Sequence, residues 1–553
     1  MEKLANDTFS LWREEGCQSI QQNFEVFRNL LASAKDLAEC GKYDAASVYA
    51  QVAAFHAQYN HCGFFVSPEL EHILIKIGRS TIPPISPSRN KSTLFSGEPK
   101  KILHVSTNIS SPFGGIPRLL RRWIQQDTER SHSVVLTGQI PLPVPKILRD
   151  TVINSHGKIY LLDMEKGGVV STAKRLRQYA AMADIVVLHT WESDVIATIA
   201  FANKEQSPPV IYVNHSDHCF WLGACISDVI VNLRESGMHL SQERRGIEAE
   251  RNLLLPTILE PLDRVLSQAE AKRQIGLAED SLMLLSIARP AKYKTIDGIT
   301  FADAHVPLLE QYEQAVLVVI GPGSREEWSA AIQKTQGRIR VLEQTENTAV
   351  FYQAADIYVD SYPFISNTSL LEAGSYGVPL VTRYPFPDAC EILRADVPGL
   401  IDNIIQVRSL EEYTAVLSRL VEDEEFRLSL GEATKKKIAE THWGSNWQHF
   451  LENVYHRAAT LPRSTVPSVP IDDKIFLSEP DVFLPRIHGQ KFDFDYLIQE
   501  SALKFMPLYQ KLLQLMRLVK KYGIYKNSSS RLGLFGYLVP NWLRYSINCL
   551  RDR

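Results

Sequence analysis

The chain has 553 residues, of which 45% are hydrophobic and 22% are charged, and its formal net charge is −3. This composition excludes collagen-like, low-complexity and wholly disordered proteins. Residues 501–553 carry ten Lys or Arg against one acid, so the rest of the chain is acidic and no nucleic-acid partner is expected.

The compartment follows from two further features of the sequence. No run of about 18 apolar residues is present, and the N-terminus lacks the apolar stretch of a signal peptide. The seven Cys residues are scattered without a C-x-x-C pair, which favours reduced thiols over a disulfide framework. We therefore expect a cytoplasmic protein.

The chain begins with a helical region. Apolar residues recur at spacings of three and four from Leu11 to Ile77, so residues 1–80 are predicted to form an α-helical N-terminal domain. The following segment is rich in Pro and Ser and shows no periodicity. Residues 81–99 are therefore predicted to be a linker.

Short apolar runs then alternate with helix-length segments, as in parallel α/β proteins. The first set is Ile102–Val105, Val134–Leu136, Lys158–Leu162, Ile185–Leu188, Val210–Val213 and Asp228–Asn232. The second set is Leu282–Ile287, Val316–Ile320, Arg338–Leu342, Ile357–Asp360 and Leu380–Thr382. Two Rossmann-like lobes are predicted, residues 100–262 and residues 263–460, the second with a closing helix at about Ser445–Ala458.

Residues 461–553 are predicted to be a Pro-rich linker and a basic, helical extension. Helical periodicity and lysines run together from Tyr496 to Tyr522, and Leu512, Leu513 and Met516 would share a face. Such a helix can rest on the anionic inner face of a membrane and bring the protein to a lipid-linked acceptor. Packing of the helix against a lobe is the alternative.

The glycine motifs argue against two cofactor classes. The first strand leads into STNISSPFGGIPR rather than G-x-G-x-x-G, and after Gly321 and Gly323 the third glycine position is Glu326. No Walker A motif is present either. Phosphate recognition must therefore come from another junction between a loop and a helix.

One such junction is DSYPFISNTSLLEAGSYGVPLVT, where a strand ends and a helix begins near Thr368. The free N–H groups of the helix start would form a seat for a diphosphate, together with the polar side chains of Ser366, Asn367, Thr368 and Ser369. Glu372, one turn further on, can accept two hydroxyl hydrogen bonds, as a ribose requires. The alternative is a simple helix cap with a solvated Glu372.

A second cluster, SIARPAKYK, places Arg289, Lys292 and Lys294 after a strand, at the edge where open α/β sheets bind ligands. Arg gives bidentate phosphate contacts and Lys a point charge. Solvated surface cations are the alternative.

Taken together, these residues resemble the second lobe of GT-B glycosyltransferases, most like glycosyltransferase family 4. The resemblance rests on Arg289 and Lys294, LVVIGPGS, ENTAVFYQAADIYVDSYPF and TSLLEAGSYGVPLVT. It implies that Arg289 and Lys294 bind the donor diphosphate, that the loop around Gly323 lies near the nucleotide, and that Glu372 holds the ribose. GT-B enzymes generally need no metal, so none is expected, although HSDHC could be read as a metal site.

One position departs from that family. Eight residues before Glu372, where the family commonly has a carboxylate near the donor sugar, this chain has Phe364. The hydroxyl-rich loop after it looks more like that of GT-B enzymes resembling O-linked N-acetylglucosamine transferases. The sequence therefore leaves open whether transfer retains or inverts configuration.

The first lobe supplies acceptor-side candidates at the ends of its strands. Gly114 and Gly115 would let the backbone approach a ligand. His215 and Asp217, followed by His218, are the leading catalytic candidates, because an imidazole oriented by a carboxylate can take a hydroxyl proton. Further candidates for the acceptor side are His189, Trp191, Glu192 and Trp221. Structural roles in the core are the alternative for each of these residues.

The sequence therefore predicts a hexosyltransferase-type glycosyltransferase. It would move sugar from a nucleotide diphosphate sugar to the hydroxyl of a glycan, lipid-linked or protein acceptor in surface glycan or glycoconjugate synthesis. The alternatives are a nucleotide-sugar epimerase of the same fold and an inactive interaction protein, which Phe364 keeps open.

Overall fold

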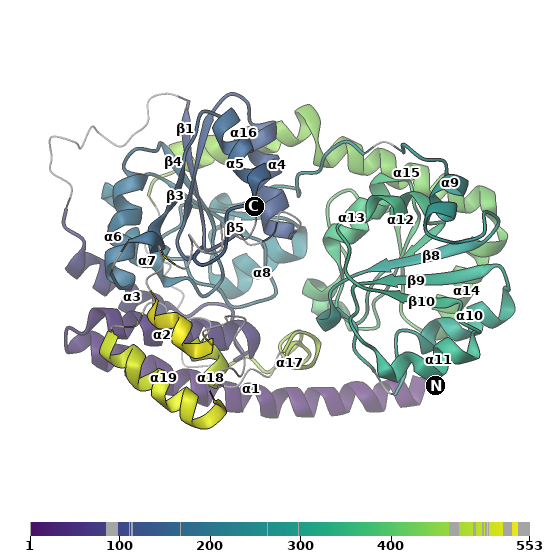
Figure 1. Cartoon of the computed structure of the whole chain (residues 1–553), viewed down its shortest axis with the longest axis horizontal. Coiled ribbons are helices and arrows are strands. Elements are labelled where there is room, and N and C mark those ends of the chain that lie inside the picture. Colours follow the sequence, from purple (N-terminus) through teal and green to yellow (C-terminus); the bar gives the residue numbers. More distant parts are fainter. Residues whose placement is uncertain are drawn as a thin grey trace.

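The computed structural model describes most of the chain, in two lobes above a layer of helices (Figure 1). The described residues are 2–84, 98–109, 111, 114–165, 167–262, 264–296, 298–463, 475–489, 494–499, 503, 506, 508–523, 533–539 and 543. Most of the predicted linker 81–99, and much of the predicted extension 461–553, lie outside these residues.

The first lobe is built on a parallel sheet with strand order β3-β2-β1-β4-β5-β6-β7. Its strands are β1 (Lys101–Ser106), β2 (Ser131–Leu136), β3 (Ile159–Leu161), β4 (Ile185–His189), β5 (Val210–Asn214), β6 (Val229–Asn232) and β7 (Asn252–Leu254). The central strands are continuous apolar runs because helices cover both faces of the sheet. These helices include α4 (Gly115–Gln126), α5 (Lys146–Asn154), α6 (Val169–Ala180), α7 (Val195–Ala200) and α8 (Glu235–Arg245).

The second lobe repeats this architecture with the order β10-β9-β8-β11-β12-β13. Its strands are β8 (Leu282–Ile287), β9 (Ala315–Ile320), β10 (Ile339–Leu342), β11 (Ile357–Val359), β12 (Leu380–Arg383) and β13 (Ile404–Val407). Its helices include α9 (Gln268–Gln274), α10 (Val306–Gln311), α11 (Ser329–Lys334), α12 (Ala349–Ala354), α13 (Asn367–Ser375), α14 (Leu410–Glu422) and α15 (Glu424–His442). The two parallel sheets confirm the predicted α/β fold class.

Helix α16 (Gly444–Thr460) follows the second lobe but packs on the first. Trp447 and Tyr455 are buried among residues of β1, β4, β5 and α4. The indole N–H of Trp123 on α4 donates to the Tyr455 hydroxyl at 2.8 Å, and the indole N–H of Trp447 donates to the Pro256 carbonyl at 2.7 Å. The chain therefore crosses between the lobes twice, once before α9 and once at α16.

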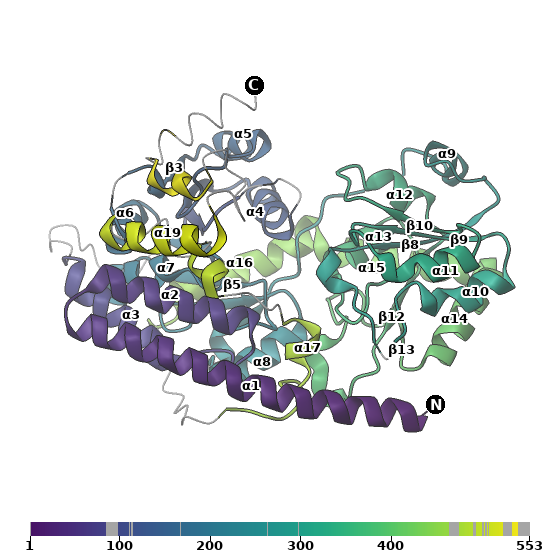
Figure 2. The same ribbon diagram turned by 60° about the horizontal axis from the view of Figure 1, so that its bottom comes forward.

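The N-terminal helices join the two lobes instead of forming a detached domain. They are α1 (Glu2–Glu39), α2 (Tyr43–Tyr59) and α3 (Pro68–Thr81), and α1 runs beneath both lobes (Figure 2). Phe27 and Leu30 belong to the core of the first lobe, whereas Trp12 and Ile20 are buried in the core of the second. The buried carboxylate of Glu71 on α3 accepts the N–H groups of residues 223–225 at 2.7 to 3.0 Å.

The C-terminal extension packs where α1 meets the two lobes. Its residues 475–489 include α17 (Leu484–Ile487), and Phe483 packs edge-on against Trp12 of α1. The buried carboxylate of Asp481 binds Arg244 of α8 at 2.8 Å. Beyond it, α18 (Phe494–Leu497) and α19 (Leu508–Tyr522) pack together. No helix among the described residues is both long enough and apolar enough to cross a membrane.

Candidate active site

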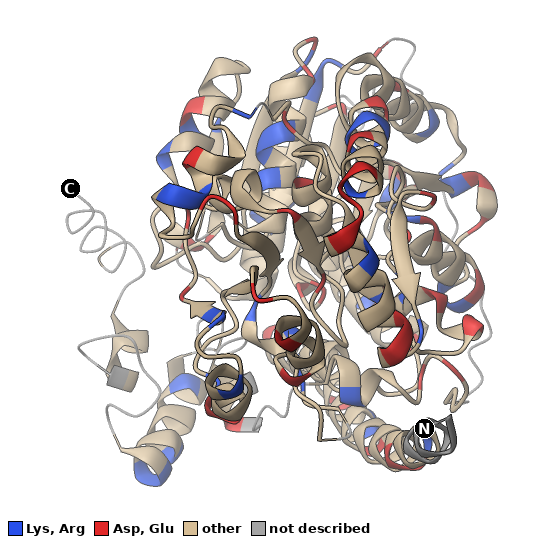
Figure 3. Ribbon diagram, turned by 90° about the vertical axis from the view of Figure 1, so that its right-hand side faces the viewer, with Lys and Arg blue, Asp and Glu red and all other residues tan. Residues whose placement is uncertain are grey.

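A cavity of about 590 Å³ lies between the two lobes. The first lobe lines it with residues of α4 and α5, and the second lobe with residues of α12 and α13. Its lining includes Arg118, Arg121, Arg122, Lys146, Glu260, Glu346, Thr348, Tyr352, Glu372 and Tyr376. Acidic and basic residues are interspersed along the ribbon (Figure 3), but α4 lines this cavity with three arginines, Arg118, Arg121 and Arg122.

Glu372 forms part of the cavity wall and is the main contact across it. Its carboxylate is 7% exposed. One oxygen pairs with Arg118 of the opposite lobe and lies 3.8 Å from Arg122, while the other accepts the Tyr352 hydroxyl at 3.3 Å. The structure thus places Glu372, the residue predicted to bind a ribose, at the cleft. Both of its carboxylate oxygens already contact other side chains.

The loop before α13 is held in place by the buried carboxylate of Asp360. This carboxylate accepts the N–H of Ser361 at 2.8 Å and the N–H of Ser366 at 3.1 Å. Ser366 in turn donates its hydroxyl to Ser369 at 3.2 Å. Burial raises the pKa of Asp360, and the nearby ammonium of Lys292 opposes this rise. Sequence reasoning did not assign Asp360 a role, although its place at the end of a strand was a usable signal.

The hydroxyl-rich loop meets the glycine loop of the first lobe. A Cβ on Gly115 would lie 3.9 Å from the Thr368 hydroxyl oxygen, so these residues face each other across the cleft. Gly114 precedes α4, and Asn367 begins α13 with a side-chain oxygen that has no hydrogen-bond partner within the described residues. The structure therefore brings together the predicted donor-binding groups of both lobes.

The cations of SIARPAKYK lie in different environments. Arg289 is exposed, and its side chain makes no hydrogen bond or ion pair with the described part of the chain, whereas its carbonyl accepts the N–H of Lys292 at 3.0 Å. Lys292 donates to the Ile365 carbonyl, and Lys294 donates to the Arg486 carbonyl of the C-terminal extension at 2.7 Å. Burial and the charge of Arg486 lower the pKa of Lys294 to about 8. The extension therefore contacts one of the two predicted diphosphate ligands.

The glycine loop after β9 lies beside these cations. Gly321 and Gly323 have φ angles of 80° and 73°, a conformation that favours glycine. A Cβ on Gly321 would meet the Ala288 carbonyl at 2.9 Å, and one on Gly323 would meet Pro290 at 3.3 Å. Gly323 thus lies against the loop that carries Arg289.

On the acceptor side, His215 is oriented by two groups. Its Nε2 donates to the Thr190 carbonyl at 3.1 Å, and its Nδ1 lies 3.4 Å from the Glu192 carboxylate. Glu192 also accepts the side-chain amide of Gln58 from α2 at 2.6 Å. A carboxylate beside the ring can stabilise the imidazolium that forms when His215 takes a proton.

Asp217 differs from its predicted role. Arg234 binds its carboxylate through two hydrogen bonds of 2.6 and 2.8 Å, and reaches on to Asp396 of the second lobe at 3.1 Å. Although burial opposes it, the Arg234 guanidinium holds the pKa of Asp217 well below its usual range. Asp217 lies 3.4 Å from the ring of His218. It therefore serves as an anchor between the lobes and a positioning residue for His218, because Arg234 occupies both of its oxygens.

His189 does not lie on the acceptor side. It is the last residue of β4 and is fully buried, with its Nε2 3.0 Å from Nδ1 of His104. His104 Nε2 is 2.9 Å from Nδ1 of His132, so three imidazoles form a chain inside the first lobe. The prediction for His189 was wrong because β4 extends one residue further than expected, which places this side chain inside the lobe.

The two tryptophan candidates differ in their exposure to solvent. Trp221 is fully buried and stacks on Tyr212 with ring centroids 4.2 Å apart, so it cannot stack on an acceptor sugar as predicted. Burial against β5 explains this outcome. Trp191 is 38% exposed and remains available.

Two parallel α/β lobes facing a shared cleft, with cations and a hydroxyl-rich helix start on the second, define the GT-B class of glycosyltransferase folds. Residues 267–437 match the family model described as glycosyl transferases group 1. This match covers the second lobe and supports the predicted resemblance to glycosyltransferases there. A search of curated protein sequences found no significant match.

A search of solved structures found chains with a similar arrangement of lobes. The glycosyltransferase of Rickettsia africae ESF-5 superposes with a TM-score of 0.50 at 11% sequence identity, covering 65% of this chain and 99% of that one. HepE of Anabaena in complex with UDP and glucose gives 0.49 at 14% identity, over 66% of this chain and 100% of that one. The O-GlcNAc transferase mutant of Thermobaculum terrenum gives 0.43 at 14% identity, over 80% and 85% respectively.

Proposed function

We propose that this glycosyltransferase moves a hexosyl unit from a nucleotide diphosphate sugar to a hydroxyl of a surface glycan or glycoconjugate. The observation that carries the proposal is the position of Glu372 in the wall of the cavity of about 590 Å³ between the lobes. A ribose there would take over the hydrogen bonds of that carboxylate. The base of the nucleotide would then lie toward α12.

The reaction breaks the bond between the anomeric carbon and the diphosphate, and the electron pair leaves with the diphosphate. Arg289, Lys294 and the N–H groups at the start of α13 stabilise this growing negative charge. The acceptor oxygen bonds to the anomeric carbon and its proton passes to His215, where Glu192 stabilises the resulting imidazolium. Lys294 must release the Arg486 carbonyl to reach the diphosphate.

The first test is the unfolding temperature of the purified protein with UDP, GDP, ADP or CMP. A ligand that binds only the folded state raises the apparent stability by RT ln(1 + [L]/Kd), about 2.7 kcal/mol at a hundredfold excess over Kd. One nucleotide should stabilise the wild-type protein and fail to stabilise Glu372→Ala. If no nucleotide stabilises the wild-type protein, the proposal is wrong and a non-enzymatic interaction protein becomes the better account.

The second test is turnover with the matching nucleotide sugar. Arg289→Ala should lower turnover by about 100-fold or more, since it removes a charge that acts mainly in the transition state. Arg273→Ala, an exposed arginine on α9 paired with Glu279, is the matched control and should keep normal turnover. Near-normal turnover of Arg289→Ala would contradict the assignment. Conversion of the donor to an epimer without any acceptor would instead indicate an epimerase.

We also propose that α19 contacts an anionic membrane surface. Leu515 and Leu518 pack against the rest of the extension, but a stripe on the other side of α19 is exposed. Its members are Leu508 (66%), Tyr509 (74%), Leu512 (38%), Leu513 (45%) and Met516 (59%). Exposed Lys520 and Lys521 near the end of the helix would favour anionic lipid.

Vesicle sedimentation tests this second proposal. Wild-type protein should bind vesicles containing phosphatidylglycerol and leave neutral phosphatidylcholine vesicles largely unbound. The double variant Leu513→Glu, Met516→Glu should lose this binding, because it places charge on the apolar stripe. Ile153→Glu, which alters an exposed apolar residue on α5 (65%), is the control. Equal binding by the double variant and the wild type would refute the proposal.

A further inference from the structure

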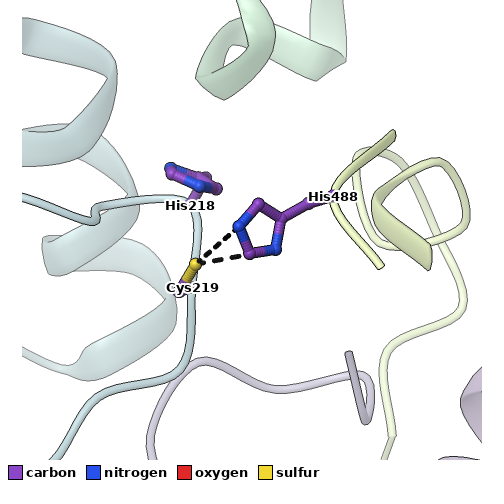
Figure 4. A group of neighbouring side chains, drawn as sticks. All are labelled: His218, Cys219 and His488. Atoms are coloured by element: carbon purple, nitrogen blue, oxygen red, sulfur yellow. Dashed lines mark hydrogen bonds between the residues drawn. The ribbon is translucent and has the colours of Figure 1, made fainter. Parts of the chain in front are cut away.

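A second group of chemically reactive side chains lies where the C-terminal extension meets the first lobe. His218 and Cys219 follow β5, and His488 follows α17, 269 residues after Cys219 (Figure 4). The Cys219 sulfur lies 3.6 Å from Nε2 and 3.8 Å from Nδ1 of His488. One ligand atom from each of the three residues can be chosen so that all lie within 4.8 Å of one another.

These distances suit a tetrahedral metal ion. With Zn–S of about 2.3 Å and Zn–N of about 2.0 Å, a tetrahedral angle puts the sulfur and nitrogen about 3.5 Å apart, within about 0.1 Å of the observed distance. The Cys219 sulfur and His488 Nε2 are 3.6 Å apart. One thiolate and two imidazoles form a donor set that suits Zn²⁺.

Outer groups hold these side chains in place. The Asp217 carboxylate accepts from Nδ1 of His218 at 3.4 Å, which leaves Nε2 for an ion, and Arg234 fixes that carboxylate. Carboxylate-bound histidines of this kind are typical of zinc sites. Arg245 fixes the loop by donating to the carbonyl oxygens of Asp217 and Cys219 at 2.8 and 2.7 Å.

On the side of the second lobe, the cluster meets an aromatic ring, with the ammonium of Lys292 4.8 Å from the centre of that ring. The ring of Phe364 lies 4.8 Å from the ring of His218 and 5.6 Å from that of His488. The sequence alone argued against a metal because HSDHC lacks the usual ligand spacing, but the fold replaces the missing ligand with His488.

We propose that His218, Cys219 and His488 bind one Zn²⁺ ion, which holds the C-terminal extension on the first lobe at the edge of the cleft. On binding, the Cys219 thiol releases its proton to solvent and the thiolate bonds to the ion, together with one neutral nitrogen from each histidine. Water takes the fourth position. The proposal does not rest on the proposed sugar transfer, because the ion is measured without donor or acceptor.

The test is the zinc content of full-length protein that carries no polyhistidine tag. After dialysis against ZnCl₂ and then metal-free buffer, mass spectrometry should find one zinc per chain. Cys219→Ser and His488→Asn should each weaken zinc binding by more than about tenfold. Cys225→Ser, which alters a buried cysteine outside the cluster, is the matched control and should retain the ion.

Two results would overturn the proposal: a wild-type protein that retains no zinc, or zinc that persists in both ligand variants. If those variants fail to fold, X-ray absorption of the zinc-loaded wild-type protein decides the matter. Its spectrum should show one sulfur and two imidazoles around the ion. A shell without sulfur, or with several sulfurs, would place the ion elsewhere and refute the site.

Discussion

The chain of buried imidazoles should make the first lobe sensitive to acid. Burial, helped by the charge of His215, lowers the pKa of His189 to about 3, and burial lowers that of His104 well below its usual value. Both residues are 0% exposed. The folded protein keeps these rings neutral at pH values where an unfolded chain protonates them, so folding becomes less favourable as the pH falls below about 6.5.

The size of the effect follows from the two pKa values. Between pH 7.5 and 5.0 an imidazole with an unfolded pKa of about 6.5 gains nearly one proton, while His189 in the folded protein gains almost none. The free energy of unfolding therefore drops by about 2 kcal/mol from His189 alone.

Urea unfolding at pH 7.5 and 5.0, followed by tryptophan fluorescence, measures this drop. The ring of Trp123 lies 5.8 Å from that of His104 and 5.7 Å from that of His189, so its emission reports on the chain. In His189→Gln, which keeps a hydrogen-bonding side chain but cannot titrate, the drop should be about 2 kcal/mol smaller than in the wild type. His449→Gln, which alters an exposed histidine on α16, should leave the drop unchanged. Equal drops in wild type and His189→Gln would refute the reasoning.

Two further predictions concern buried carboxylates. Asp217→Ala should lower the free energy of unfolding by about 3 kcal/mol without any substrate present, because it leaves Arg234 buried with its charge partly unpaired. Thermal unfolding of the free protein measures this loss. An unchanged unfolding midpoint would contradict the anchoring role of Asp217 and leave it with a purely catalytic role. Glu71→Gln should cost about 1–3 kcal/mol, because an amide group cannot accept all three N–H groups of residues 223–225. The same measurement checks it, and a loss below about 0.5 kcal/mol would show that α3 is held to the first lobe by apolar packing alone.

The central strands of both sheets could be predicted because they are buried on both faces and read as continuous apolar runs. Two strands were missed, β7 and β13. Both lie at an edge of their sheet, where less burial permits short and mixed sequences such as Asn252–Leu254. Helix α13 was predicted within one residue of its start, since the polar loop before it carries the usual signals of a helix start.

The site was predictable on the second lobe and less so on the first. The candidates from Ser366 to Glu372 share one local stretch of sequence, so their proximity follows from a single loop and helix. On the first lobe, the place of a side chain depends on where its strand ends. Strand β4 is one residue longer than predicted, and this difference puts His189 inside the lobe. His488 could not be found at all, because nothing in a Pro-rich segment indicates a partner 269 residues away.

The ion pairs between the lobes could not be predicted from the sequence. Arg118 pairs with Glu372, and Arg234 joins Asp217 to Asp396. Each joins residues of different lobes, so no local pattern records it. The first of these pairs uses the same carboxylate that the proposed ribose site requires. In the proposed donor complex, the ribose hydroxyls and the Arg118 guanidinium share the Glu372 carboxylate, so the donor contacts the group that pairs across the cleft.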